Sequence, residues 1–259
     1  MRSATSHEVR HALATELSLQ MQASLPAIQE LSFVDKNTWI EDHISRRLLQ
    51  IRNPTLLDRY VPIQTTGDSN CLFRAVSRLR YGTELHHARL RLMCACEVIL
   101  HPDTYDRSSS SMYPPFKDSR YLVIPCLQEV LDEILRIGST DRGYAGVVVI
   151  LALSSIIAAP ITMVYPLTSA DGLYDEYSQT VFGRDVDVNK ESYSVMWTTA
   201  RDEQFTISTE ICVNHFIALL KHELGMKNLF LIINLKEFLF TCVTCDSHDS
   251  RTIINLVLL

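Results

Sequence analysis

Basic residues are in deficit in this sequence. The 24 Lys and Arg residues are outnumbered by 30 Asp and Glu residues, which gives a net charge of -6 at pH 7. General nucleic-acid binders usually have a basic balance. The composition therefore argues against nucleic acid as a partner.

Paired cysteines and a signal peptide are missing as well. The seven cysteines are odd in number and scattered, whereas secreted disulfide scaffolds have paired frameworks. Residues 1–22 are polar and charged and lack the apolar segment of a signal peptide. We therefore expect a reduced, intracellular protein, either cytoplasmic or nuclear.

No uninterrupted apolar run reaches the length of a membrane span. The longest apolar stretch, Ala145 to Tyr165, is broken by Ser154, Ser155, Pro160 and Thr162. A span needs about 20 predominantly apolar residues, so a buried helix followed by a strand fits this stretch better. We expect no membrane partner.

The sequence also lacks a complete set of metal ligands. Cys242 and Cys245, with His248 nearby, suggest zinc. A structural zinc site needs four ligands, and no second Cys/His pair follows at a suitable spacing. We therefore expect no metal and no cofactor.

The composition that is present is typical of a globular protein, with 47% hydrophobic and 21% charged residues. The patterns predict helices over 39–51, 85–100, 126–136 and 145–158, one more from residue 71, and strands over 161–165, 193–198 and 211–219. This order of helices and then strands indicates an α+β fold. Residues 1–50 are predicted to form a helical extension with an apolar stripe of Leu13, Leu17, Met21 and Leu25.

The predicted helix from Cys71 follows a cluster of turn residues, Gly67 to Asn70, in which Asp68 is placed as the N-cap. Unpaired N–H groups at a helix N-terminus favour a thiolate and can hold an oxyanion. Gly67 permits a tight turn that exposes the sulfur. A second interpretation of the same pattern is a plain capped helix with a buried, inert cysteine.

Residues 67–77, Gly-Asp-Ser-Asn-Cys-Leu-Phe-Arg-Ala-Val-Ser, resemble the nucleophile motif of the ovarian-tumour (OTU) cysteine proteases, which typically reads Gly-Asp-Gly-Asn-Cys-Leu-Phe-Arg-Ala. Residues 152–165 resemble that family's helix-then-strand segment, and residues 214–220 resemble its histidine block. The resemblance covers about residues 60–222. Within the family, the chain resembles the OTU-like domains of transposon-associated proteins. It implies a small central sheet packed between helices in an OTU-like domain over 51–222, followed by a tail over 223–259.

The resemblance also implies the chemistry. Cys71 would be the nucleophile, His215 its base, and Asp68 would shape the loop and help to form an oxyanion hole with Gly67, Ser69 and Asn70. The implied activity is a thiol-dependent deubiquitinase that hydrolyses isopeptide bonds between ubiquitin, or a ubiquitin-like modifier, and lysine through a thioester. The implied partner is ubiquitin or a ubiquitinated protein.

The sequence departs from the OTU pattern beside the histidine. The third group, an Asp or Asn, often lies two residues from it, where side chains share a strand face. Here Val213 and Ile217 occupy those positions and cannot accept a hydrogen bond. Asn214 could orient the ring if a bulge brought it round. The alternative is a catalytically weak or inactive OTU-like module that binds ubiquitin or another protein.

The helix that follows Cys71 lies in a locally basic stretch. Its arginines are Arg74, Arg78, Arg80, Arg89 and Arg91, and Glu84 alone opposes them. The pattern is typical of a solvated helix face, and a surface for phosphate or an acidic partner is the other interpretation.

Overall fold

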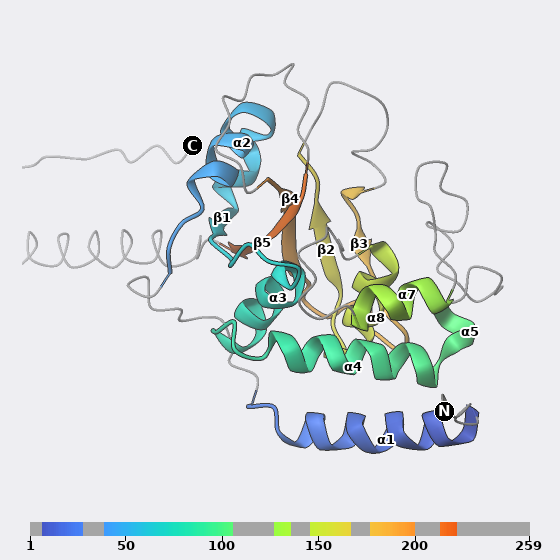
Figure 1. Cartoon of the computed structure of the whole chain (residues 1–259). Coiled ribbons are helices and arrows are strands. Elements are labelled where there is room, and N and C mark those ends of the chain that lie inside the picture. The colour runs from blue at the N-terminus through green and yellow to red at the C-terminus, as the bar shows by residue number, and fades with distance from the viewer. Residues whose placement is uncertain are drawn as a thin grey trace, which may run out of the picture. The chain divides into compact units, whose positions relative to one another are not determined.

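The computed structural model describes residues 7–27, 39–105, 127–135, 146–166, 177–199 and 213–221. The chain divides into two compact units, Met1–Lys221 and His222–Leu259. All of the described residues belong to the first unit, which contains the elements labelled in Figure 1.

A five-stranded sheet forms the centre of this unit. Its strands are β1 (Tyr60–Ile63), β2 (Ile161–Val164), β3 (Thr180–Val181), β4 (Tyr193–Thr198) and β5 (His215–Lys221), in the spatial order β1-β5-β4-β2-β3. β2 pairs with β4 in parallel, and the other neighbours are antiparallel. The register places Thr198 of β4 opposite His215, the first residue of β5.

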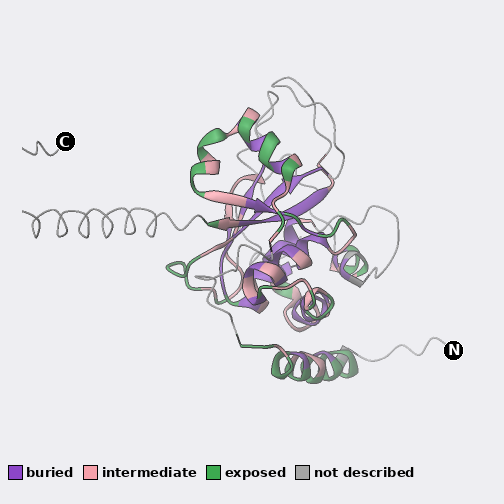
Figure 2. Ribbon diagram, turned by 90° about the vertical axis from the view of Figure 1, so that its left-hand side faces the viewer, coloured by how far each residue is buried: buried purple, intermediate pink, exposed green. Residues whose placement is uncertain are grey.

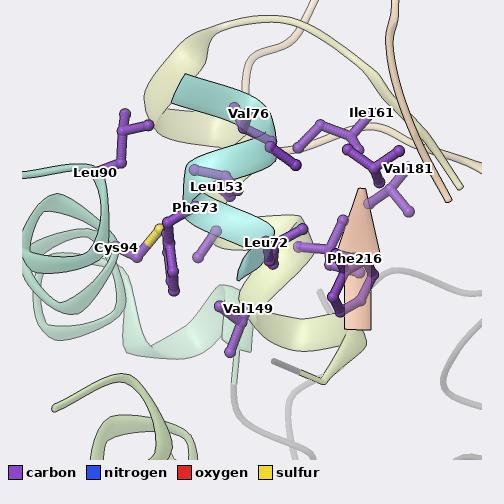
Figure 3. Packing of buried hydrophobic residues seen from close by; sticks show 14 of the residues in the cluster. Leu72, Phe73, Val76, Leu90, Cys94, Val149, Leu153, Ile161, Val181 and Phe216 are labelled. Atoms are coloured by element: carbon purple, nitrogen blue, oxygen red, sulfur yellow. The ribbon is translucent and has the colours of Figure 1, made fainter. Parts of the chain in front are cut away.

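Helices α3 (Cys71–Tyr81) and α8 (Val147–Ile157) pack on one face of the sheet. Helices α4 (His87–Leu100) and α7 (Leu127–Leu135) pack in turn against these helices and against each other. Helix α8 buries nine of its eleven residues, as expected for an almost entirely apolar helix. Figure 3 shows Leu72 of α3 beside Phe216 of β5, within the same buried cluster as Leu153 of α8. This contact fixes the N-terminal end of α3 against the beginning of β5.

Helix α2 (His43–Arg52), followed by a short 3₁₀ helix (Pro54–Asp58), covers the opposite face. Leu48 and Leu49 pack there against Ile217 and other inward-facing strand residues. The Asp42 carboxylate caps α2 by accepting a hydrogen bond from the Ser45 N–H at 2.7 Å. The helix therefore starts later than the predicted residue 39, because the preceding Glu41 pairs with Ile63 in an isolated β-bridge.

Helix α1 (His7–Ala23) packs along α4, where Ala14 and Met21 contact Met93 and Cys96. Leu13 is 54% exposed, so its predicted place in the apolar stripe was wrong. Most of α1 lies open to solvent, in contrast to the buried sheet (Figure 2). Small Ala14 lets the two helices approach, which a leucine-centred stripe did not predict.

The α+β class and the small central sheet between helices are confirmed. The strand over 193–198 and the helix from residue 71 were predicted with correct starts. β5 begins at His215 and not at residue 211, and the short strands β1 and β3 were not predicted as strands. None of the helices in the described ranges has the length and apolar character that a bilayer crossing requires.

A close backbone approach joins α8 to the turn after β3. A Cβ on Gly183 would lie 2.2 Å from the Ser155 backbone nitrogen, so part of α8 would have to shift. We expect Gly183→Ala to lower the free energy of unfolding by about 1–3 kcal/mol. Urea denaturation measures this, with Gly67→Ala as the matched control because its new Cβ would meet only His215 Cε1, at 3.8 Å. Equal stability of the two variants would contradict the packing.

Candidate active site

The Cys71 sulfur lies at the N-terminal end of α3. Backbone hydrogen bonds from Phe216, Leu72 and Cys71 itself lower the pKa of the thiol, as the end of a helix should. Burial acts in the opposite direction and is the larger effect, because the side chain is only 7% exposed. The net result raises the pKa of Cys71 to about 11. Cys71 is therefore a protonated thiol at neutral pH.

The loop before Cys71 is organised by the Asp68 carboxylate. It accepts a hydrogen bond from the Asn70 N–H at 2.9 Å and forms an ion pair with Arg74 at 2.8 Å. Burial opposes ionisation of Asp68, but these bonds outweigh it and lower its pKa. The residue at the N-cap position is Asn70, without a side-chain cap bond, so the predicted Asp68 cap was wrong.

Arg91 of α4 holds the same loop from beneath. Its guanidinium donates to the Ser69 carbonyl at 3.1 Å, to Asn70 Oδ1 at 2.6 Å and to the Ile134 carbonyl of α7. Gly67 is not among the described residues with a positive φ, so the turn does not depend on the conformational freedom of glycine that we predicted. Side-chain bonds rather than glycine therefore set the shape of this loop.

His215 is buried at the start of β5, and its Nε2 lies 3.1 Å from the Thr65 carbonyl oxygen. A carbonyl oxygen only accepts, so Nε2 carries the proton in this bond. Burial lowers the pKa of His215, against the raising effect of the Thr65 bond and of Asp42, Asp68 and Glu84. The ring is consequently neutral at pH 7, with Nδ1 unprotonated and able to act as a base.

The hydrogen-bond partner of His215 Nε2 is a main-chain carbonyl. Among the described residues, the side chains weighed as its partner from the sequence, those of Val213, Asn214 and Ile217, do not bond to it. Ile217 is fully buried against α2. The Asn214 N–H bonds to the Thr198 carbonyl at 2.9 Å, which continues the pairing of β5 with β4. The Thr65 carbonyl occupies the role that we had assigned to an Asp or Asn side chain.

The fold brings Cys71 and His215 to the same corner of the sheet. The Phe216 backbone lowers the pKa of the Cys71 thiol, and Phe216 directly follows the histidine. Gly67, in the loop before Cys71, lies close to the imidazole of His215. A Cβ added at Gly67 would be 3.8 Å from Cε1 of the ring. Within the described residues the thiol and the imidazole do not share a hydrogen bond, and the hydrogen bond of the imidazole goes to Thr65.

The arginines of the basic stretch form ion pairs and hydrogen bonds with other parts of the molecule. Arg74 and Arg78 pair with Glu84, and Arg80 and Arg89 donate to backbone carbonyls of other elements, those of Ile157 and Ser24. The predicted solvated face fits the exposed Arg89, whereas the Arg74 and Arg78 side chains are only 19% and 21% exposed. The surface for phosphate or an acidic partner stays a prediction. Glu84 was missed as a site residue, although a single acid among five arginines was a signal for a partly buried ion-pair network.

Metal ligands do not gather in this site. Among the residues that the structure describes, no group of three or more His, Cys, Asp and Glu side chains could hold a metal ion. The possible zinc ligands Cys242, Cys245 and His248 lie outside the described residues.

The raised pKa of Cys71 has a consequence for small electrophiles. With a pKa of about 11, about one thiol in ten thousand is ionised at pH 7, against about a few in a hundred for an ordinary cysteine. We expect iodoacetamide to alkylate Cys71 about 100-fold more slowly than a free thiol, with a rate that rises through pH 9. Mass spectrometry of the Cys71 peptide measures this, and unfolded protein provides the fast control. A rate plateau from pH 7 upward would contradict a protonated thiol.

Comparison with known proteins gives one family and several solved structures. The family model described as "Vertnin, OTU domain" matches residues 62–198. The OTU domain of OTUD1 is 18% identical, with a TM-score of 0.41, covering 68% of this chain and 99% of that one. The viral OTU domain protease from Farallon virus is 18% identical, with a TM-score of 0.40, covering 64% and 86%. The protease from Qalyub virus is 16% identical, with a TM-score of 0.36, covering 64% and 87%. No curated protein matches the chain.

Proposed function

Because this chain belongs to the vertnin OTU-domain family, we propose that it is a thiol-dependent hydrolase acting on isopeptide bonds between ubiquitin, or a ubiquitin-like modifier, and lysine. One observation carries the proposal. Cys71 begins α3, which packs against β5, and the oriented ring of His215 belongs to the first residue of β5. A nucleophile beside an oriented base is what acyl transfer requires.

The protonation states define the first step. A neutral thiol faces a neutral imidazole whose Nδ1 is unprotonated, so His215 acts as a general base during the attack. The Sγ–H proton moves to Nδ1 while the sulfur forms a bond to the isopeptide carbonyl carbon. The C–N bond then breaks, the lysine amine takes the proton from Nδ1, and a thioester remains. Water then attacks the thioester carbonyl carbon and gives a proton to Nδ1. The C–S bond breaks, the sulfur takes that proton back from Nδ1, and the carboxylate leaves with the second proton of the water.

The negative oxygen formed in the attack needs donors near the sulfur. The N–H groups of Asn70 and Cys71 are already bonded to Asp68, whereas the Ser69 N–H has no acceptor among the described residues. Ser69 is also fixed through its carbonyl by Arg91. We assign the Ser69 N–H as an oxyanion donor, a role in which a rigidly held group is most effective.

In this proposal the hydrogen bond between the Cys71 thiol and His215 Nδ1 forms when the substrate binds. The buried thiol is unreactive as it stands, and a small movement of the loop over 67–70 against His215 would close the pair. Catalytic hydrogen bonds often tighten only when substrate is bound. Ubiquitin, bound over a large surface, can supply the free energy for that movement, whereas a small electrophile cannot.

Cleavage of lysine-linked di-ubiquitin by the whole chain tests this proposal. We expect mono-ubiquitin to appear with the wild-type chain and with Cys96→Ala, which removes a buried cysteine on the α1 side of α4. Cys71→Ala should release none. No product from folded wild-type chain, across ubiquitin linkages and ubiquitin-like modifiers, would refute the hydrolase and leave a binding module.

A further inference from the structure

The peptide group between Thr65 and Thr66 is bonded on both sides. Its carbonyl oxygen, on Thr65, receives the Nε2–H of His215 at 3.1 Å. Its N–H, on Thr66, donates to Glu84 Oε1 at 3.2 Å, and the Thr66 hydroxyl donates to Glu84 Oε2 at 2.7 Å. One peptide unit thus connects a carboxylate to the imidazole.

We propose that Glu84 is a positioning residue that orients and polarises His215 through the Thr65–Thr66 peptide group. This inference rests on the proposed hydrolase function and deepens it. It assigns the third member of the site, which the side chains beside His215 do not supply.

The physical basis is the conjugation of the amide. A carboxylate that accepts from the N–H side draws the N–H dipole toward itself and raises the electron density on the carbonyl oxygen, so chains of hydrogen bonds strengthen one another. A better acceptor at Thr65 holds the Nε2–H tautomer and stabilises the imidazolium formed during attack. The Glu84 carboxylate therefore influences the His215 imidazole without a direct contact between them.

Glu84 is itself fixed and ionised. Arg78 contacts Oε1 at 2.8 Å and Arg74 contacts Oε2 at 3.5 Å, and the Glu84 side chain is 11% exposed. Burial favours the neutral acid, but the bonds from Thr66 and Arg78 outweigh it and lower the pKa of Glu84. The Arg78 guanidinium also lies over the Trp39 ring, 5.5 Å from its centre. A partly buried carboxylate that is held by four bonds loses little further freedom when it holds a loop.

Two other carboxylates influence His215. Asp42 caps α2, and Asp68 is committed to Asn70 and Arg74. Both raise the pKa of the imidazole, as Glu84 does. Neither carboxylate has a hydrogen bond to the Thr65–Thr66 peptide group among the described residues. They act on the ring through their charge alone, whereas Glu84 is also connected to it by hydrogen bonds.

The test compares three variants of the whole chain, labelled with ¹⁵N-histidine. Glu84→Ala removes the acceptor of Thr66, Glu84→Gln keeps an acceptor oxygen without the charge, and Asp42→Asn removes a nearby charge while it leaves the peptide bonded. The ¹⁵N shifts of the His215 ring report its tautomer and its pKa. His215→Gln identifies the signal among the nine histidines.

We expect the wild-type chain, Glu84→Gln and Asp42→Asn to hold the Nε2–H tautomer, and Glu84→Ala to show a mixture of both tautomers. Glu84→Gln should lower the imidazole pKa, since a charge that favours the imidazolium is gone. Glu84→Ala should also react with a ubiquitin probe about tenfold more slowly, a part of what general-base catalysis contributes. Glu84→Gln should recover most of that rate.

A single Nε2–H tautomer and an unchanged rate in folded Glu84→Ala would overturn the inference. A tautomer mixture in Asp42→Asn as large as that in Glu84→Ala would overturn it too, because charge alone would then suffice. If the wild-type chain does not react with the probe but Glu84→Ala still loses its tautomer, the proposed hydrolase fails while the positioning role of Glu84 stands.

Discussion

We expect Cys71→Ala to abolish di-ubiquitin cleavage and to leave ubiquitin affinity within about twofold of the wild-type value. Loss of a catalytic nucleophile lowers kcat by about 10⁴-fold or more, which takes turnover below detection. The affinity should persist because the buried sulfur offers little surface to a partner, at 7% exposure of the residue. Turnover assays and isothermal titration on the same preparation separate the two quantities.

A loss of folding must be separated from this result. The removal of one buried sulfur atom costs about 1 kcal/mol, much less than a domain's stability. Thermal unfolding of Cys71→Ala beside Cys96→Ala shows whether the two are equally folded. Residual cleavage by Cys71→Ala above one part in a hundred would exclude Cys71 as the nucleophile.

We expect His215→Ala to lower kcat by about 10³-fold with little change in KM. The expected loss follows from removal of the group that takes the thiol proton, since general-base catalysis contributes about 10² to 10⁴-fold. Burial holds the imidazole pKa below its usual 6.5. The wild-type kcat/KM should therefore remain high down to pH 6.5 and fall only as the ring is protonated at lower pH.

The matched comparison is the double variant Cys71→Ala with His215→Ala. Because the two groups act as a unit, the double variant should be no slower than Cys71→Ala alone. A fall of kcat/KM that begins above pH 7 would contradict the lowered imidazole pKa. A His215→Ala variant with full activity would assign the base to another residue.

The sequence predicted those parts of the site that depend on the types of neighbouring residues along the chain. The turn cluster before Cys71 predicted the start of a helix, and α3 begins at that residue. The strand predicted over 193–198 matches β4 over its full length. The family resemblance placed His215 within the block that becomes β5, against the N-terminal end of α3. These features depend on local periodicity and motif, which a single sequence carries.

The connections between segments were not predictable in the same way. The acceptor for His215 is a main-chain carbonyl, which every residue has, so Thr65 gave no signal. Asp68 was a reasonable N-cap by type, but its ion pair with Arg74 draws it away from the helix end. Glu84 bonds to Thr66 across 18 positions of the chain, and only tertiary packing decides such a partner.

Reaction of the folded whole chain with a ubiquitin probe that carries a C-terminal electrophile tests the central claim most directly. Peptide mapping then identifies the modified residue, and iodoacetamide at the same concentration serves as the small-electrophile control. We predict one adduct, on Cys71, formed much faster than alkylation by iodoacetamide and lost in His215→Ala. Folded chain that stays unmodified by probes of ubiquitin and ubiquitin-like modifiers, or a probe attached to another cysteine, would contradict the account.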